Sequence, residues 1–259
     1  MPTLTIDGRA VSVPAGSTIL DAARALGIDV PTLCWYPKLP VVGNCRICLV
    51  QVEGAPKLIA ACATAAADGM RVTTESDAAV KNRQGVLAML LERYPAEDIP
   101  DVGSRNEFES LVHRYEVPTT RRSGMSLRTG DDRAGDPIIQ HDMSTCILCT
   151  RCVRACEDIQ VVGVLDVAYR GDHAQIIVGA DGNPEHAGCT WCGECVRVCP
   201  TGAIHDILAL ARPTESASGN GRHTGNGAAR TGGNGQSATT DQGHGARGNG
   251  DTHDGNGKA

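Results

Sequence analysis

Short runs in which apolar and polar positions alternate dominate the first 75 residues, and this pattern is typical of half-buried strands. Residues 3–6 and 11–13 form two such runs, and the Asp7-Gly8 pair between them favours a two-residue hairpin turn. Further strands are expected at residues 49–52, 58–60 and 71–73. The N-terminal part therefore predicts a small, strand-rich domain.

Helical periodicity interrupts and then follows these strands. Thr18 and Asp21 have the spacing of a capping box, and Gly27 ends the helix that this box would begin. A longer helix is expected over residues 76–93, and a short one over 106–115. The apolar positions that should face inward are Ile19, Ala22, Ala23 and Leu26 in the first helix and Val80, Leu87, Leu90 and Leu91 in the second. Strands are expected again at 161–167 and 174–178, so the fold class is α+β.

The C-terminal segment cannot contribute to a core. From Pro213 onward the chain has no Val, Ile, Leu, Met, Phe, Tyr or Trp, which predicts a disordered Gly/Asn-rich tail over 213–259. Acidic and basic residues cancel in that tail, so the net charge of −6 belongs to residues 1–212 and argues against a nucleic-acid partner. No apolar stretch has the length of a membrane span, and the first residues do not have the pattern of a signal peptide. We therefore expect a cytoplasmic protein.

All twelve cysteines fall into three groups with regular spacing. The first group has the spacing C-x10-C-x2-C-x13-C, and the other two repeat C-x2-C-x2-C-x3-C; the members are Cys34, Cys45, Cys48 and Cys62, then Cys146, Cys149, Cys152 and Cys156, then Cys189, Cys192, Cys195 and Cys199. The repeated run is the pattern of bacterial ferredoxins with two clusters. Disulfides suit small secreted domains, and structural zinc usually takes two separated ligand pairs. The spacing therefore favours one [2Fe-2S] and two [4Fe-4S] clusters, although the opening gap of ten departs from the plant-type gap of four.

The repeat also predicts which cysteines share a cluster. In ferredoxins with two clusters, the fourth cysteine of each run binds the other cluster. On that pattern one [4Fe-4S] cluster takes Cys146, Cys149, Cys152 and Cys199, and the other takes Cys189, Cys192, Cys195 and Cys156. The [2Fe-2S] cluster takes Cys34, Cys45, Cys48 and Cys62.

Several other residues lie beside the cysteines. We expect Arg151, Arg154 and Arg197 to be solvated on helix faces, with compensation of cluster charge or docking of an acidic partner as the alternatives. His141 is expected to make a local contact, with contact to a cluster as the alternative. For Trp35 and Trp191, shielding of a cluster and ordinary packing stay open. For Gly43, close approach of the backbone to sulphur and an ordinary turn stay open.

The sequence does not support a substrate site. No G-x-G-x-x-G follows an expected strand, and no P-loop is present. Every cysteine is already assigned to a cluster, so none is left as a nucleophile. These observations predict a non-catalytic electron carrier that depends on partner proteins.

The cysteine segments resemble a known family. Pro31-Thr-Leu-Cys34, Asn44-Cys-Arg-Ile-Cys48, Ala61-Cys62-Ala-Thr64 and the run Cys146 to Cys156 are similar to the diaphorase-side iron-sulphur subunit of NAD-reducing [NiFe]-hydrogenases. Asp166-Val-Ala-Tyr-Arg-Gly171 and Cys189-Thr-Trp-Cys-Gly-Glu-Cys195 fit as well. The same module resembles the N-terminal region of NAD-linked formate dehydrogenases and of the large iron-sulphur subunit of complex I. The resemblance covers about residues 1–210.

This resemblance implies a domain plan and a set of partners. It implies a β-grasp [2Fe-2S] domain over residues 1–75, a helical connector over 76–137 and a ferredoxin-like domain with two [4Fe-4S] clusters over 138–212. It also implies a flavin- and NAD-binding partner subunit. We expect the chain to relay single electrons between that subunit and a catalytic hydrogenase or formate dehydrogenase subunit. The alternatives are a freestanding ferredoxin-like carrier that serves several redox partners and, less favoured, a zinc scaffold.

One segment departs from the family pattern. The family usually holds a further cluster in the connector through one histidine and three cysteines. In this sequence Tyr94 aligns with the histidine, and Asp98, Asp101 and Glu107 align with the cysteines. Carboxylates are poor substitutes for thiolates on such a cluster, so we expect that cluster to be missing.

Overall fold

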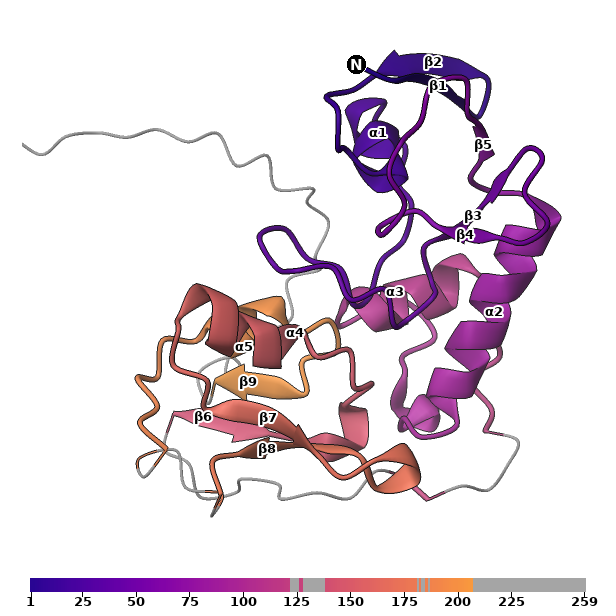
Figure 1. Cartoon of the computed structure of the whole chain (residues 1–259). Coiled ribbons are helices and arrows are strands. Elements are labelled where there is room, and N and C mark those ends of the chain that lie inside the picture. The colour runs from indigo at the N-terminus through magenta and orange to yellow at the C-terminus, as the bar shows by residue number, and fades with distance from the viewer. Residues whose placement is uncertain (122–125, 128–137, 181, 183–184, 186, 207–259) are drawn as a thin grey trace, which may run out of the picture. The chain divides into compact units, whose positions relative to one another are not determined.

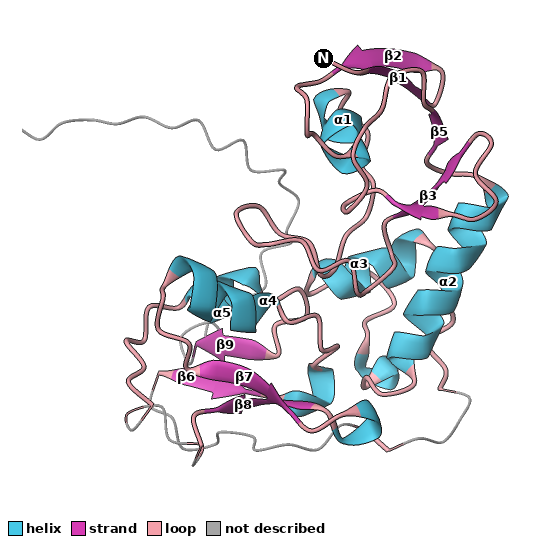
Figure 2. Cartoon of the chain, in the orientation of Figure 1, coloured by secondary structure: helices cyan, strands magenta, loops and turns pink. Residues whose placement is uncertain are grey.

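The computed structural model describes residues 1–121, 126–127, 138–180, 182, 185 and 187–206. All of these residues belong to one compact unit. Figure 1 traces their helices and strands in chain order, and Figure 2 separates helices, strands and loops by colour. The expected tail at 213–259 and most of residues 122–137 lie outside the described residues, and the domain boundaries given above stay predictions.

The N-terminal part is a five-stranded mixed sheet with the strand order β2-β1-β5-β3-β4. Strand β1 (Thr3–Ile6) is antiparallel to β2 (Arg9–Ser12) and parallel to β5 (Arg71–Thr73). Strand β3 (Leu49–Val52) is antiparallel to both β5 and β4 (Ile59–Ala60). Alternate strand residues, such as Leu4 and Ile6 of β1 and Val50 and Val52 of β3, pack together with helix α1 (Ile19–Ala25) in one apolar cluster.

Local chemistry explains how these elements begin and end. Asp7 and Gly8 have positive φ values of 47° and 78°, the left-handed conformations that a tight turn of the primed type needs. At the start of α1, the Thr18 hydroxyl accepts a hydrogen bond from the Asp21 amide, and the Asp21 carboxylate accepts one from the Thr18 amide. The expected capping box is therefore present.

A helical segment follows the sheet. Helix α2 (Asp77–Leu91) begins after the capping residue Ser76, the 3-10 turn η1 covers Ala96–Asp98, and helix α3 (Glu107–Arg114) begins after the capping residue Asn106. These elements share an apolar cluster with residues of both neighbouring cysteine regions: Leu33, Ile47, Leu87, Leu91, Tyr94, Phe108, Val112, Tyr115 and Ile147. The expected inward positions hold for Leu87 and Leu91, whereas Val80 and Leu90 are only partly buried.

Two short sheets and several short helical segments form the C-terminal part. Strand β6 (Ile139–His141) pairs with β9 (Ile204–Asp206), and β7 (Leu165–Ala168) pairs with β8 (Gln175–Val178). The helical segments are η2 (Met143–Thr145), α4 (Arg151–Arg154), the π-helical η3 (Ala155–Ile159), η4 (Gly171–His173) and α5 (Glu194–Val198).

The strand expected at 161–167 begins later than the apolar pattern suggested. Val161 and Gly163 have positive φ values of 57° and 65°, which no regular strand accommodates. Pairing of β7 therefore starts only at Leu165. Among the described residues, no helix combines the length and the apolar character that crossing a membrane requires.

Candidate functional site

The first cysteine group lies on the loop between α1 and β3 and on the turn after β4. Cys34, Cys48 and Cys62 are buried and Cys45 is half-buried. The Cys48 and Cys62 sulphurs are 3.3 Å apart, and the thiols of Cys34 and Cys45 are hydrogen-bonded to each other. The structure thus brings the four predicted ligands together as two pairs.

This paired arrangement suits two metal ions with two thiolates each. Tetrahedral metal–sulphur bonds of about 2.3 Å place two sulphurs on one metal about 3.8 Å apart. A single zinc ion would instead need three or four ligands around one point. Within the described ranges, no group of three or more His, Cys, Asp or Glu side chains is arranged to hold one metal ion. The two sulphur pairs therefore fit a binuclear group with two thiolates on each metal.

The same pairing sets the protonation of these thiols. A hydrogen bond with Cys45 lowers the pKa of Cys34 to about 5, and a hydrogen bond with Cys62 lowers the pKa of Cys48 to about 7. The partner thiols Cys45 and Cys62 have raised pKa values because of their hydrogen bonds with Cys34 and Cys48 and because they are buried. Each pair thus offers one thiolate readily, and bound metal would displace the second proton.

The backbone of this loop contains unusual conformations. Gly43 has a φ of 60° and Arg46 a φ of 57°, and the Cys34 amide donates to the Cys45 sulphur over 3.4 Å. A Cβ added to Gly43 would lie 3.6 Å from the Ala63 Cβ, an ordinary contact. At Gly43 the structure therefore requires a left-handed conformation rather than extra space.

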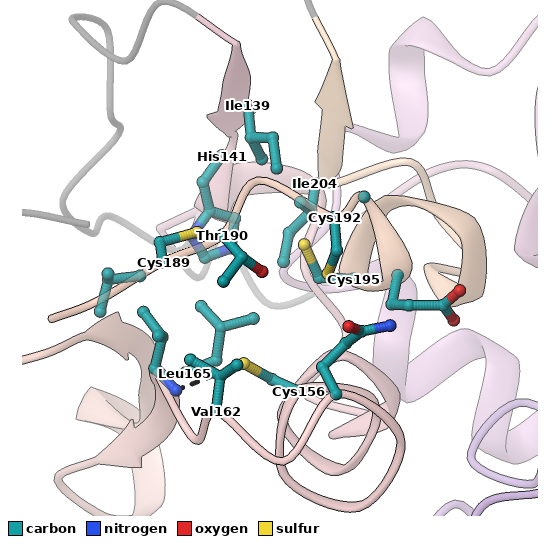
Figure 3. Close-up of a pocket in the computed structure, with 15 residues that line it drawn as sticks. Ile139, His141, Cys156, Val162, Leu165, Cys189, Thr190, Cys192, Cys195 and Ile204 are labelled. Carbon is teal, nitrogen blue, oxygen red and sulfur yellow. Dashed lines mark hydrogen bonds between the residues drawn. The ribbon is translucent and has the colours of Figure 1, made fainter. Parts of the chain in front are cut away.

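The second and third cysteine groups line two cavities. One cavity, of about 310 Å³ including its part open to solvent, is lined by Cys146, Cys149, Cys152 and Cys199, and we call it the Cys146 cavity. The other, of about 610 Å³ on the same measure, is lined by Cys156, Cys189, Cys192 and Cys195, and we call it the Cys189 cavity. In Figure 3 the labelled Cys156 approaches the Cys189 cavity from the side opposite the other three cysteines. The grouping is the crossed one that the sequence predicted.

The two repeated cysteine runs share a backbone feature: a residue with a positive φ donates its amide to the sulphur of the cysteine two positions before it. Leu148 has a φ of 53° and donates its amide to the Cys146 sulphur over 3.4 Å. Trp191 has a φ of 48° and donates to the Cys189 sulphur over 3.4 Å. In addition, the Val164 amide donates to the Cys156 sulphur over 3.3 Å. Such bonds stabilise negative charge on sulphur. These three amide donors were not predicted, because a backbone amide has no residue type of its own that would mark it in the sequence.

Burial makes these cavities poor places for free thiolates. It raises the pKa of Cys149 to about 12 and that of Cys195 to about 12, and it raises the pKa of Cys152 well above its ordinary value. Thiolates at these positions therefore need a compensating cationic group. Four thiols around an otherwise largely apolar cavity fit a [4Fe-4S] cluster, with iron as the cationic group.

Two arginines overturn the expectation of solvated side chains. Arg151 is 1% exposed and Arg154 is 7% exposed, and each makes several hydrogen bonds inside the protein, although the Arg151 Nε makes none among the described residues. Arg151 bonds the Glu107 carboxylate at 2.9 Å and the Val198 and Thr32 carbonyls. Arg197 agrees better with the expectation, since its side chain is 50% exposed and pairs with Glu194.

The remaining neighbours have clear positions. His141 is buried and lines both the Cys146 cavity and the Cys189 cavity, a wider role than the expected local contact. Trp35 packs against the core of the N-terminal sheet under the Arg24 guanidinium. Trp191 packs against the apolar cluster of the C-terminal part.

The connector residues that align with a further cluster site have other partners or face solvent. Asp98, Asp101 and Glu107 are all exposed, and Glu107 pairs with Arg151. Tyr94 is buried, and its hydroxyl donates to the Glu109 carboxylate over 3.0 Å. Glu109 was not predicted as part of a site, because it belongs to no recognisable sequence motif. The absence of that cluster stays a prediction.

Family models match two segments of the chain. Residues 1–77 match the "2Fe-2S iron-sulfur cluster binding domain", and residues 136–205 match the "NADH-quinone oxidoreductase subunit 3, ferredoxin-like domain". These matches confirm the expected order of a [2Fe-2S] domain followed by a ferredoxin-like domain.

Two similar proteins are subunits of NADPH- or NADP-linked oxidoreductases. The chain is 37% identical over 205 residues to NADPH-Fe(3+) oxidoreductase subunit alpha of Geobacter sulfurreducens, covering 79% of this chain and 24% of that protein. It is 39% identical over 227 residues to NADP-reducing hydrogenase subunit HndD of Solidesulfovibrio fructosivorans, covering 82% of this chain and 38% of that protein. The chain thus spans between a quarter and two fifths of these relatives.

A solved structure has the same fold. A chain of the NAD+-reducing [NiFe]-hydrogenase crystal structure in the H2-reduced state superposes with a TM-score of 0.71 at 27% identity. The match covers 83% of this chain and 92% of that chain. The resemblance stated from the cysteine segments is therefore confirmed.

Proposed function

We propose that this chain is an electron-transfer subunit of an NAD-linked oxidoreductase complex. Its N-terminal segment matches a 2Fe-2S iron-sulphur cluster binding domain, and its later segment matches the ferredoxin-like domain described for NADH-quinone oxidoreductase subunit 3. The observation that carries the proposal is the sorting of all twelve cysteines into three sets of four. One set forms two sulphur pairs, and each of the other two lines a cavity.

The proposed ligands follow from these sets. One [2Fe-2S] cluster is held by Cys34, Cys45, Cys48 and Cys62. One [4Fe-4S] cluster is held by Cys146, Cys149, Cys152 and Cys199, and a second by Cys156, Cys189, Cys192 and Cys195. Bound clusters of these kinds accept and release single electrons.

The chain's own groups supply the surroundings that such chemistry requires. Amides of Cys34, Leu148, Val164 and Trp191 donate to cysteine sulphurs and stabilise added negative charge. Apolar side chains beside the sulphurs, Ile147, Ile176 and Ile204 among them, limit the access of water to the Cys146 cavity. These residues hold and tune the redox groups, and we assign none of them to catalysis.

The proposed partners come from the relatives. One relative is named for NADPH and another for NADP, and the solved structure is that of an NAD+-reducing hydrogenase reduced by H2. We propose a flavin- and NAD-binding subunit at one end of the relay and a catalytic hydrogenase subunit at the other, with formate dehydrogenase as the second choice. A complex of this kind would work in the cytoplasm.

The test is a reduction experiment on the anaerobically purified chain. Dithionite should produce electron paramagnetic resonance signals of reduced [2Fe-2S] and [4Fe-4S] clusters. NADH alone should produce none, because hydride transfer needs a flavin or nicotinamide site. NADH together with the co-purified flavoprotein should reduce the clusters. A colourless, zinc-containing chain, or rapid reduction of the flavin-free chain by NADH, would overturn the proposal.

A further inference from the structure

The ten residues between Cys34 and Cys45 make contacts outside their own domain. Within this segment, which we call the 35–44 loop, Leu39 is buried against Ala155 and Val198 of the ferredoxin-like part. Tyr36 packs against the same cluster, and its hydroxyl accepts a hydrogen bond from Arg197 over 2.8 Å. The loop that lengthens the first cysteine gap is therefore also a docking element.

Arg154 joins this loop to two candidate cluster sites at once. One terminal nitrogen of its guanidinium donates to the Pro40 carbonyl over 2.6 Å. The other donates to the carbonyl of Cys34 over 2.6 Å and to that of Cys149 over 3.4 Å. Cys34 belongs to the first cysteine group, and Cys149 lines the Cys146 cavity. One side chain thus bonds the main chain of a ligand residue from each site.

Among the described residues, no carboxylate is hydrogen-bonded to the Arg154 guanidinium, although the Asp158 carboxylate acts on its charge. Its hydrogen bonds, including one from its Nε to the Thr150 carbonyl, all go to main-chain oxygens among the described residues. An arginine stays protonated even when burial lowers its pKa, as it does here. A buried positive charge therefore lies where two sets of thiolates would carry negative charge.

The packing supports the same junction. Cys45 and Cys149 both pack against the apolar cluster that contains Leu33, Ile47 and Ile147. Each of these three apolar residues neighbours a cysteine in the sequence. The peptide segments that carry the two sites thus share one core, which limits their relative movement.

The internal repeat provides a natural comparison. Arg197 precedes the fourth cysteine by two positions in its run, as Arg154 does in the other. Yet Arg197 is half-exposed and pairs with Glu194, and no ligand carbonyl is among its hydrogen-bond acceptors in the described structure. Equivalent positions in the repeat therefore have different surroundings, so the repeat itself does not explain the burial of Arg154.

We propose that Arg154 and the 35–44 loop form an internal redox junction, which positions the [2Fe-2S] site against the Cys146 site for direct one-electron exchange. The inference rests on the proposed function. Each exchange oxidises one cluster by one electron and reduces the other by one, with no bond broken and no proton moved. Because each reduction adds a negative charge, the guanidinium favours the reduced state at both sites. Arg154 is thus a positioning residue that also tunes potential.

Three variants of the full chain test the junction. Arg154→Met removes the charge and the fork of donors, Arg154→Lys keeps the charge alone, and Arg9→Met, at an exposed position of β2, is the control for loss of one arginine. Iron content is measured first. Redox titration with dithionite and electron paramagnetic resonance then gives the potential of each cluster, and the broadening between signals of the fully reduced chain reports the spin coupling of the two sites.

We expect Arg154→Met to retain its iron and to lower the reduction equilibrium constant of the [2Fe-2S] cluster at least tenfold, which is 59 mV for one electron. Its spin coupling to the Cys146 cluster should also weaken. Arg154→Lys should keep most of the potential but lose coupling, and Arg9→Met should change neither. If Arg154→Met loses iron, the spin coupling of Arg154→Lys is the test: weakened coupling supports the junction, and unchanged coupling overturns it. An unchanged potential and unchanged coupling in an iron-loaded Arg154→Met chain would overturn the junction. Absence of iron from the wild-type chain would instead overturn the proposed function.

Discussion

The Tyr94 hydroxyl donates a 3.0 Å hydrogen bond to the carboxylate of Glu109, whose side chain is fully buried. Arg105 completes the arrangement with a hydrogen bond of 2.7 Å to the same carboxylate oxygen. Burial raises the pKa of Glu109, but the hydrogen bonds from Arg105 and Tyr94 outweigh it, so the net pKa is lowered. A satisfied polar network, packed against the Phe108 ring, thus occupies the connector position where the resemblance implies a cluster ligand at Tyr94.

Removing members of this network should destabilise the chain unequally. Tyr94→Phe deletes one neutral donor and should lower the free energy of unfolding by about 1 kcal/mol. Arg105→Met leaves a buried carboxylate without its cation and should cost about 3 kcal/mol. Urea unfolding followed by circular dichroism measures both, with the exposed Arg9→Met as control. Equal, negligible effects of the two variants would show that Glu109 gains nothing from Arg105.

The iron content of the purified chain should be about ten atoms per molecule, with matching sulphide, from one [2Fe-2S] and two [4Fe-4S] clusters. The connector carboxylates Asp98, Asp101 and Glu107 are exposed, and carboxylates are poor substitutes for thiolates, so we expect no further cluster from them. Colorimetric iron and sulphide assays on anaerobically purified protein measure this number. About fourteen irons would mean that the connector holds a cluster through other ligands.

What the sequence could predict depended on how local the determining interaction was. The capping box of Thr18 and Asp21 and the turn at Asp7-Gly8 act within a few residues, and both were read correctly. The cysteine runs gave the order of the domains because their spacing is itself a ligand geometry. Arg154 instead bonds Cys34, 120 residues away, and Arg83 bonds Ile47, 36 residues away. No pattern around either arginine signals burial, since a charged residue becomes buried only when distant carbonyls happen to satisfy it.

Crossed ligation can be separated from ligation within each run by two alanine variants. Cys48→Ala should remove the [2Fe-2S] signal and leave both [4Fe-4S] signals, because the N-terminal sheet supplies that entire ligand set. Cys156→Ala should instead deplete the cluster of the Cys189 cavity, which Cys156 lines together with the third cysteine group.

Electron paramagnetic resonance of the dithionite-reduced variants distinguishes the two cubane signals, and Cys189→Ala provides the reference for loss at the Cys189 cavity. The Cys156→Ala spectrum should match that reference. If it matched the spectrum of Cys146→Ala instead, the ligands would not be crossed.

A large loss of stability is predicted for substitution of Arg83. Its side chain is fully buried on α2 and donates to the carbonyls of Ile47, Leu49 and Thr74 at 3.2, 3.2 and 2.8 Å. It also forms an ion pair of 2.9 Å with Glu75. The first two carbonyls flank the proposed ligand Cys48, so this single side chain fastens the connector helix to the loop that carries Cys48.

Arg83→Met should therefore lower the free energy of unfolding by about 3 kcal/mol or more, because it leaves buried carbonyls without donors. Lys81→Met, an exposed change two residues earlier on the same helix, should stay within about 0.5 kcal/mol of the wild type. The two losses are compared by urea unfolding, and the rate of iron release from the [2Fe-2S] site during unfolding should rise only in the Arg83 variant. If Arg83→Met unfolded and released iron like Lys81→Met, the carbonyl contacts of Arg83 would contribute nothing to holding the cluster loop, and the apolar cluster around Ile47 and Leu87 would have to hold it alone.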